Sequence, residues 1–151
     1  MRSDIHIRWL IRRDMREVMA IEHGSFEFPW GERDFIECLR QRNCIGMVAE
    51  LHGVIAGYMV YELCRNHIKL LSIAVDPNLR RLGVGTAMMT KLKSKLNHIK
   101  RREIVFDVRE TNLPAQLFFR AVDCKAIGIN PNLYRDTDED AYLFTYSEQM
   151  A

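Results

Sequence analysis

The chain has 151 residues and a formal net charge of +2, which suits one ordinary domain with a buried core. Its 48% hydrophobic and 28% charged residues are typical of a globular protein, and so small a net charge indicates neither a nucleic-acid partner nor a membrane surface. No apolar run is long enough to span a membrane, and the N-terminus lacks the apolar segment of a secretion signal. We therefore expect a single domain over residues 1–151, located in the cytoplasm.

The four cysteines, at positions 38, 44, 64 and 124, show no C-x-x-C spacing. Cys64 and His67 are three residues apart, but no second pair completes a zinc site. We expect buried, reduced thiols and no bound metal.

The first elements alternate between strand and helix patterns. Residues 5–10 alternate as a strand, and apolar residues between Met15 and Ile21 then follow helical spacing, with Asp14 as the expected cap. An aromatic cluster around a proline follows at residues 26–30 and leads into a second short helix. The rings of Phe28 and Trp30 either fasten two helices to a sheet or form a wall of a substrate site, and both interpretations stay open here.

Residues 47–51 and 54–63 are expected to form two strands joined by a tight turn at His52 and Gly53. Gly57 inside the second strand indicates a bulge or a close approach to the backbone. The chain then turns into an apolar, β-branched strand at residues 68–75, which completes a meander.

A basic loop with two glycines joins this strand to a helix. Asp76, Pro77 and Asn78 end the strand, and apolar residues recur at four-residue steps from Val84 to Ile99, which predicts a long amphipathic helix. The first N–H groups of a helix lack intrahelical acceptors and carry the positive end of its dipole, so they favour an anion. The sequence lacks the Lys-Ser/Thr of a P-loop and the third glycine of a dinucleotide fingerprint, and it predicts a different phosphate-binding loop.

The last third of the chain continues this mixed pattern. Basic residues 100–102 are expected to cap the long helix, and residues 103–109 form a strand with Asp107 out of place in its middle. Asp107 either pairs with a cation such as Arg109 or has a function. Asn112 and the residue before it are expected to cap a further helix, whose core side chains are Ala115, Phe118, Phe119 and Val122.

Residues 124–129 and 141–146 are the last expected strands, and an acidic loop spans residues 130–140 between them. Its acidic spacing lacks the glycine and the final glutamate of a calcium loop, so we reject that reading. The loop is either simply solvated or a collar that attracts a basic substrate.

The motif Arg80-x-x-Gly83-x-Gly85, after a strand that ends Ile-Ala-Val-Asp-Pro, strongly resembles the pyrophosphate loop of the GNAT N-acetyltransferases. Residues 20–30, 107–112 and 138–141 extend the resemblance to the RimI-type ribosomal-protein alanine N-acetyltransferases. The resemblance implies an α/β fold with a mixed sheet of six to seven strands, about four helices and a V-shaped opening between two parallel strands. It also implies acetyl-CoA as cofactor, without a metal, and direct attack of an amine on the thioester.

The resemblance carries the family's contacts onto matching positions of this chain. Pantetheine contacts fall on Ile73, Ala74 and Val75. Cofactor contacts in the loop and beyond fall on Arg80, Arg81, Leu82, Gly83, Val84, Gly85, Thr86, Asn112 and Phe119. Substrate contacts fall on Phe28, Trp30, Tyr134 and Asp138.

The catalytic pair departs from the family pattern. Asp107 stands where the family has a glutamate, and Phe119 stands where it has a tyrosine. An α-amine has a pKa near 7.7 to 8.0, so a modest base suffices, and we expect Asp107 to act through a water. The thiol leaves as a thiolate with little help, so the missing hydroxyl slows the reaction without abolishing it, and Tyr134 is the candidate replacement acid.

The favoured acceptor is a protein N-terminus, such as that of a basic ribosomal protein. The alternatives are a small-molecule amine, or a non-catalytic module that binds acetyl-CoA. A lysine side chain ranks below the α-amine because its pKa of about 10.4 demands more of the base.

Overall fold

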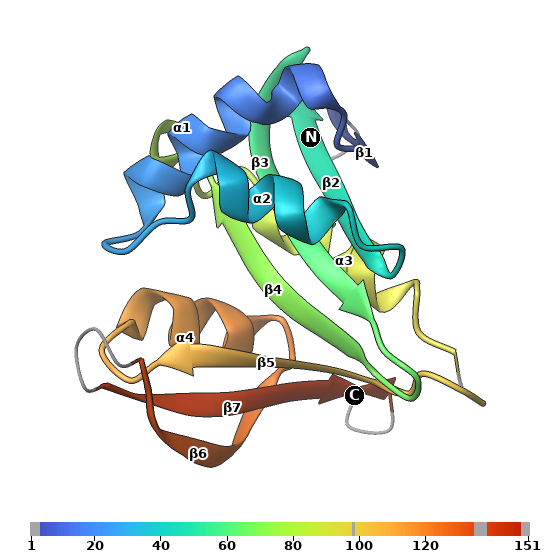
Figure 1. The fold of residues 1–151 in the computed structure, drawn as a ribbon, viewed down its shortest axis with the longest axis vertical. Coiled ribbons are helices and arrows are strands. Elements are labelled where there is room, and N and C mark those ends of the chain that lie inside the picture. The colour runs from blue at the N-terminus through green and yellow to red at the C-terminus, as the bar shows by residue number, and fades with distance from the viewer. Residues whose placement is uncertain (1–3, 98, 135–138, 149–151) are drawn as a thin grey trace. The chain divides into compact units, whose positions relative to one another are not determined.

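The computed structural model describes residues 4–97, 99–134 and 139–148, with the backbone alone at positions 132 and 134 (Figure 1). In this part of the chain the strands form one mixed sheet in the order β1-β2-β3-β4-β5-β7-β6. The chain divides into two compact units: the N-terminal unit runs to Leu63 and includes Leu70–Lys95, and the C-terminal unit comprises Cys64–Lys69 and the residues from Leu96 onward. No helix among the described residues is long and apolar enough to cross a membrane.

The N-terminal unit holds four strands and three α-helices, and strand β4 begins in the C-terminal unit. Its elements are β1 (Ile5–Trp9), η2 (Arg12–Asp14), α1 (Met15–Ser25), α2 (Glu32–Leu39), β2 (Cys44–Leu51), β3 (Val54–Leu63), β4 (Ile68–Val75), η3 (Pro77–Leu79) and α3 (Val84–Lys93). Strands β1, β2 and β3 are antiparallel. The predicted hairpin turn is confirmed, because His52 and Gly53 both have positive φ, as a two-residue turn requires.

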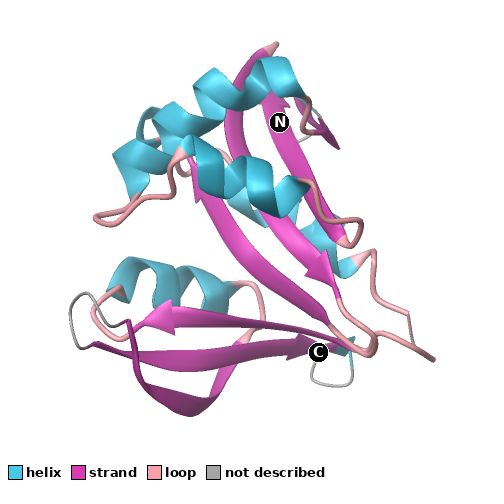
Figure 2. Cartoon of the chain, viewed as in Figure 1, coloured by secondary structure: helices cyan, strands magenta, loops and turns pink. Residues whose placement is uncertain are grey.

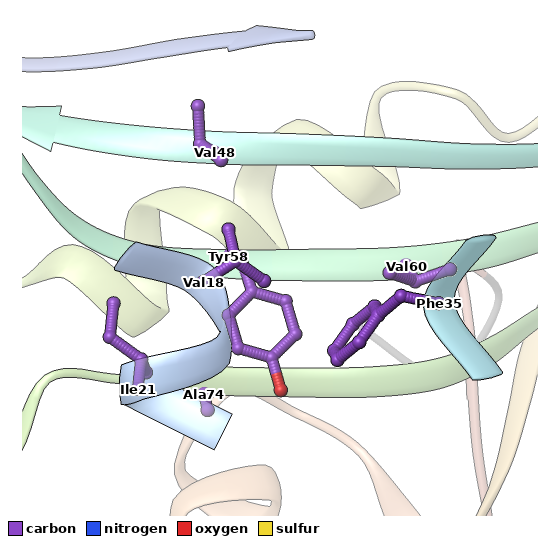
Figure 3. Close-up of a cluster of buried hydrophobic side chains, with 7 residues drawn as sticks. All are labelled: Val18, Ile21, Phe35, Val48, Tyr58, Val60 and Ala74. Atoms are coloured by element: carbon purple, nitrogen blue, oxygen red, sulfur yellow. The ribbon is translucent and has the colours of Figure 1, made fainter. Parts of the chain in front are cut away.

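Helices α1 and α2 cover one face of strands β2–β4, and α3 lies on the other face (Figure 1). The core beneath α1 and α2 is built from side chains of five elements, which Figure 3 shows converging on the ring of Tyr58. These residues are Val18, Ile21, Phe35, Val48, Tyr58, Val60 and Ala74. Their exposed fractions lie between 0% and 8%, so this cluster is a hydrophobic core of the unit.

Asp14 does not cap helix α1, contrary to the prediction. Its carboxylate accepts the N–H of Ile11 at 2.8 Å and forms an ion pair with Arg8 at 2.8 Å, so it closes the short turn η2 before the helix. The Arg8 guanidinium lowers the pKa of the Asp14 carboxyl. Asp14, although it lies at a helix start, therefore binds Arg8 of strand β1 and not the N–H groups of the helix.

Gly57 fulfils both alternatives that the sequence left open. The register of β2 and β3 shifts between Ala49 and Glu50, which places a bulge beside Gly57. A Cβ at position 57 would lie 2.9 Å from the carbonyl oxygen of Ala74 and 2.9 Å from Cε of Met88. Strand β4 and helix α3 therefore both lie close to the backbone of β3 at Gly57, which has no side chain.

Helix α3 is shorter than the apolar spacing predicted. It ends at Lys93, and Ile99 is 87% exposed and does not extend its buried face. The expected capping of this helix by residues 100–102 is also wrong, because Arg101 donates from Nε to the carbonyl oxygen of Cys64 at 2.6 Å.

All four cysteines are free thiols. Cys44 and Cys124 are buried as expected, whereas Cys38 and Cys64 are half-buried. The Sγ atoms of Cys38 and Cys44 lie 3.4 Å apart, and burial raises the pKa of the Cys38 thiol to about 12.

The C-terminal unit is a three-stranded antiparallel sheet with one helix on one face, seen in Figure 2 as magenta strands beside a cyan helix. Its elements are β5 (Glu103–Arg109), α4 (Leu113–Ala121), β6 (Lys125–Tyr134) and β7 (Glu139–Ser147). The start of β4 pairs in parallel with β5, joining Ile68 to Ile104 and Lys69 to Val105, which confirms the predicted parallel pair. Strand β6 runs on to Tyr134, so the predicted loop at residues 130–140 is in part strand.

Replacing Gly57 by alanine tests the close approach of β4 and α3 to this backbone. The added methyl forces a backbone carbonyl away, so we expect Gly57→Ala to lower the free energy of unfolding by about 1–3 kcal/mol. Urea denaturation followed by circular dichroism measures the change. The matched control is Gly128→Ala in strand β6, where an added Cβ meets none of the described atoms within 4 Å. Equal stability of both variants would contradict the packing argument.

Candidate active site

The loop of residues 80–86, called the phosphate loop below, places a helix N-terminus after strand β4. Asp76 accepts the N–H of Asn78 at 2.9 Å and so starts the turn η3. Gly83 precedes α3 with φ +84°, a left-handed conformation that favours glycine, and no side chain caps the helix there. The first intrahelical hydrogen bond of α3 runs from the N–H of Ala87 to the Gly83 oxygen at 2.9 Å. The N–H groups of residues 84–86 therefore precede the helical ladder and suit an anion.

Side chains add positive charge to this helix terminus. Arg80 and Arg81 are both exposed, and Arg81 has φ +66°, which turns the chain sharply into the glycine. Leu82 is 50% exposed, whereas Val84 is buried and anchors the start of the helix. Exposed cations beside helix N–H donors both favour an anion such as a pyrophosphate.

The strand before the loop is held firmly against the sheet. Ala74 is 8% exposed, with the half-buried Ile73 and Val75 on either side. The N–H of Asp76 donates to the carbonyl oxygen of Ala56 at 2.7 Å, which fixes the end of β4 to β3. The three predicted pantetheine residues thus lie in a strand whose end is fixed to β3, shortly before the phosphate loop.

Of the two aromatic residues predicted to contact the substrate, Trp30 is packed against a neighbouring ring and Phe28 is exposed. The ring of Trp30 meets Phe35 edge-on with centroids 5.0 Å apart, and Phe26 also packs against the core cluster. Phe28 is 43% exposed. Trp30 therefore fastens the loop after α1 to α2, and Phe28 stands at the surface of the same loop.

Sequence reasoning missed a buried carboxylate beside these aromatics. Glu22 on α1 is 2% exposed, and its Oε2 accepts the backbone N–H of Trp30 at 2.9 Å. Its Oε1 accepts hydrogen bonds from the hydroxyl of Tyr58 and, at 3.4 Å, from that of Ser72. The available signal was the position of Glu22 four residues after Val18, on the apolar face of an amphipathic helix.

In the C-terminal unit, Asp107 lies on the sheet face opposite to α4. Its Oδ1 accepts a hydrogen bond from Nδ2 of Asn130 on β6 at 2.6 Å. Arg109 on the same strand forms an ion pair with Glu139, the Arg109 NH1 lying 3.6 Å from the Glu139 Oε2. Asn130 is thus a partner of Asp107 that the sequence did not indicate, because the two residues are 23 positions apart.

Asn112 caps helix α4 as predicted, since its side-chain oxygen accepts the N–H of Ala115 at 3.2 Å. Gln116 donates from Nε2 to the carbonyl oxygens of Arg109 and Glu110 at 3.1 and 3.0 Å. These bonds fix the connection between β5 and α4, and hence the place of Asn112 beside the end of β5.

Phe119 is 5% exposed and belongs to a cluster of aromatic rings. Its centroid lies 4.3 Å from that of Phe106, 5.2 Å from Phe118 and 6.2 Å from Phe144. Because neighbouring residues of a strand point to opposite faces, Phe106 with its partner Phe119 and Asp107 lie on opposite faces of β5. The ring of Phe119 therefore takes part in the packing of α4 against β5.

Two further predicted residues lie at the edge of the described chain. The backbone of Tyr134 pairs with Glu139 at the end of β6, and its side chain lies outside the described residues. Asp138 also lies outside them. Among the residues that the structure describes, no cluster of histidine, cysteine and carboxylate side chains could hold a metal ion.

Residues 13–123 match the acetyltransferase (GNAT) family. This match covers most of the chain, and the protein therefore belongs to that family and is a GNAT N-acetyltransferase. A Bacillus subtilis protein, a putative ribosomal protein bS18 alanine N-acetyltransferase, is 27% identical over 144 residues, which are 95% of each chain. An N-alpha-acetyltransferase of Sulfurisphaera tokodaii is 31% identical over 143 residues, covering 86% of this chain and 85% of that protein.

The crystal structure of the ribosomal-protein-S18-alanine N-acetyltransferase from Escherichia coli has a TM-score of 0.82 at 24% identity. The alignment covers 95% of this chain and 93% of that chain. This similarity confirms the GNAT fold that the sequence motifs predicted, with a mixed sheet of seven strands and four α-helices among the described residues.

Replacing Gly85 by aspartate tests the phosphate loop. At an effective dielectric constant of about 20, a carboxylate about 5 Å from a phosphate charge costs about 3 kcal/mol, so we expect CoA affinity to fall by more than about a hundredfold. Isothermal titration calorimetry with CoA measures the loss. Thr90→Asp, which adds the same charge to the exposed face of α3 about one and a half turns further on, is the matched control. Normal affinity of the Gly85 variant would rule out CoA binding at this loop.

Proposed function

We propose that the protein transfers the acetyl group of acetyl-CoA to the N-terminal α-amine of a protein or peptide. The observation that carries the proposal is the phosphate loop, where free helix N–H groups and two arginines follow the predicted pantetheine strand. Membership of the GNAT family supports acetyl-CoA as the donor. The names of the relatives, which refer to ribosomal protein bS18 and to α-amines, support a protein N-terminus as the acceptor.

The residues of the N-terminal unit have binding roles in this proposal. The N–H groups of residues 84–86 and the guanidinium groups of Arg80 and Arg81 hold the pyrophosphate. The polar backbone groups of Ile73–Val75 hold the pantetheine by strand-like hydrogen bonds. When bound, acetyl-CoA supplies a thioester whose carbonyl carbon is open to an amine. The positive end of the α3 dipole also favours negative charge on the departing thiolate.

Asp107 has the chemical role in the proposal. The amine nitrogen bonds to the acetyl carbon as the carbon–sulfur bond breaks, and the nitrogen must then lose a proton. Asp107, one methylene shorter than the family's glutamate, accepts that proton through a water. Asn130 holds one of its oxygens and leaves the other for this water. Tyr134 is proposed to protonate the thiolate, in place of the hydroxyl that Phe119 lacks.

The proposed acceptor is a basic N-terminus, such as that of a ribosomal protein. Phe28 and Trp30 contact its first side chains, and the acidic residues around Asp138 attract its positive charge. Newly made proteins and acetyl-CoA meet in the cytoplasm, where we place the reaction.

The deciding experiment offers acetyl-CoA and a library of N-terminal peptides to the purified protein and records acetylated products by mass spectrometry. We expect acetylation at the α-amine, with a preference among first residues and for basic sequences further on. Faster turnover of a polyamine or free amino acid than of any peptide would select the small-amine alternative. Calorimetric binding of acetyl-CoA without transfer to any amine would instead make the protein a non-catalytic binding module.

Substitution of Asp107 tests the proposed base. Asp107→Ala removes the carboxylate, and Asp107→Asn keeps an oxygen for Asn130 while it removes the base. We expect either change to lower kcat about 10- to 100-fold, at the low end of general-base effects, because part of the α-amine is already neutral at pH 7. Calorimetry should give unchanged CoA affinity for both variants. Unchanged turnover would remove Asp107 from the mechanism.

A further inference from the structure

The buried carboxylate of Glu22 joins three segments of the N-terminal unit. It lies on α1 and accepts hydrogen bonds from the loop after α1, through the N–H of Trp30, and from β3, through the hydroxyl of Tyr58. The third donor, the hydroxyl of Ser72 on β4, lies 3.4 Å from the same carboxylate and 3.0 Å from the Tyr58 hydroxyl. Figure 3 shows that the Tyr58 hydroxyl points toward β4.

The same residues close a ring of contacts around the loop. The Trp30 ring packs edge-on against Phe35, and Phe35 packs edge-on against Tyr58 with centroids 5.7 Å apart. The hydroxyl of Tyr58 reaches Glu22, which returns to the backbone of Trp30. Trp30 is therefore held from both sides, by its ring and by its N–H.

The two segments that Glu22 joins, strand β4 and the loop at Trp30, differ in rigidity. Ser72 is the residue before Ile73, in a strand that pairs within the sheet, so it is the fixed end. Residues 26–31 have no regular secondary structure, so the loop has few backbone hydrogen bonds of its own to hold it. The Trp30 N–H needs a buried acceptor, and Glu22 supplies one that is tied to β4.

A carboxylate is a costly residue for this purpose. Taking a charge out of water is expensive, and burial is tolerated where hydrogen-bond donors surround the charge, as three do here. An apolar residue at position 22 would pack against the core at lower cost but could not hold the Trp30 N–H. Buried polar groups of this kind fix one arrangement among several that hydrophobic contact would allow.

We infer that Glu22 is a positioning residue, which with Tyr58 fixes the Trp30 loop relative to β4 and thereby sets the affinity for the acceptor N-terminus. The inference rests on the proposed function for its acceptor. Acetyl-CoA binding does not depend on it, because β4 and the phosphate loop are fixed to β3 and α3 by their own backbone hydrogen bonds.

Two variants each remove a different contact of the Glu22 network. Glu22→Gln keeps the shape and one acceptor oxygen but removes the charge, and Tyr58→Phe removes a single hydroxyl. We expect each to raise KM for an acceptor peptide about five- to tenfold, the equivalent of one ordinary net hydrogen bond. The kcat and the KM for acetyl-CoA should stay within about twofold of the parent values, as expected for loss of acceptor binding alone.

The matched control is Tyr61→Phe. Tyr61 is 2% exposed on the same strand, but an odd number of residues from Tyr58, so its ring points to the other face. This variant should leave KM for the peptide unchanged. A merely structural role of Glu22 would lower the thermal midpoint and the fraction of active enzyme but would not change KM for the peptide.

A second readout needs no turnover. Trp9 and Trp30 are the two tryptophans, and Trp9 is 70% exposed, so Trp9→Phe leaves Trp30 as the sole indole emitter. In this background Glu22→Gln and Tyr58→Phe should make Trp30 emission more accessible to acrylamide, while circular dichroism shows a folded protein and Tyr61→Phe causes no change.

The peptide KM and the quenching of Trp30 together distinguish a failure of the proposed acceptor from a failure of the role inferred for Glu22. If the indole becomes more accessible but no peptide is acetylated by the parent protein, the loop is positioned by Glu22 and the proposed acceptor is wrong. If the parent acetylates peptides but both variants retain its KM and its quenching, Glu22 is not a positioning residue.

Discussion

The carboxylate of Glu22 sets a strict physical constraint on the N-terminal unit, because a buried charge is stable only among hydrogen-bond donors. Its donors come from the loop at Trp30, from β3 at Tyr58 and from β4 at Ser72. Hydrophobic contacts such as those of Phe35 are not directional and would tolerate small sliding of α1 over the sheet. The hydrogen bonds of Glu22 would not, so a polar network selects the arrangement that the apolar core stabilises.

Local sequence patterns predicted those elements whose ends are marked by turn-forming or polar residues. Strands β4 and β5 run over the residues that alternation and the flanking polar residues indicated, and the turn at His52 adopts the conformation that its glycine neighbour suggests. Helix α3 was predicted too long because Leu96 and Ile99 continue its helical spacing, at steps of four and three residues, by chance. The chain leaves the helix at Lys93, where no glycine or proline marks the end. Asp14 was misassigned because the competing cation, Arg8, belongs to an earlier strand.

The sequence predicted the phosphate loop of the candidate site but not the hydrogen-bond networks of Glu22 and Asp107. The phosphate loop lies within a few consecutive residues, so spacing alone indicates its chemistry. Glu22 lies 36 residues from Tyr58 and 50 from Ser72, and Asp107 lies 23 residues from its partner on β6. Sequence shows that such a carboxylate is unusual, but its donors are defined only once strands distant in the chain become neighbours in the sheet. The burial of Phe119 among aromatic rings is likewise a property of the folded unit.

The proposed acceptor explains why a chain without the family's tyrosine can still be an enzyme. Compared with a lysine side chain, an α-amine has a pKa lower by about 2.5 units, so its neutral form costs about 3 kcal/mol less at pH 7. Little is then gained from a strong base, and more from holding the amine against the thioester, since orientation contributes a large part of such rate enhancements. In the role that we infer for it, the loop fixed through Glu22 and Tyr58 supplies this orientation. At Phe119 the missing hydroxyl would serve only a thiol that already leaves readily, whereas the inferred role of the buried Glu22 is to hold the acceptor in place.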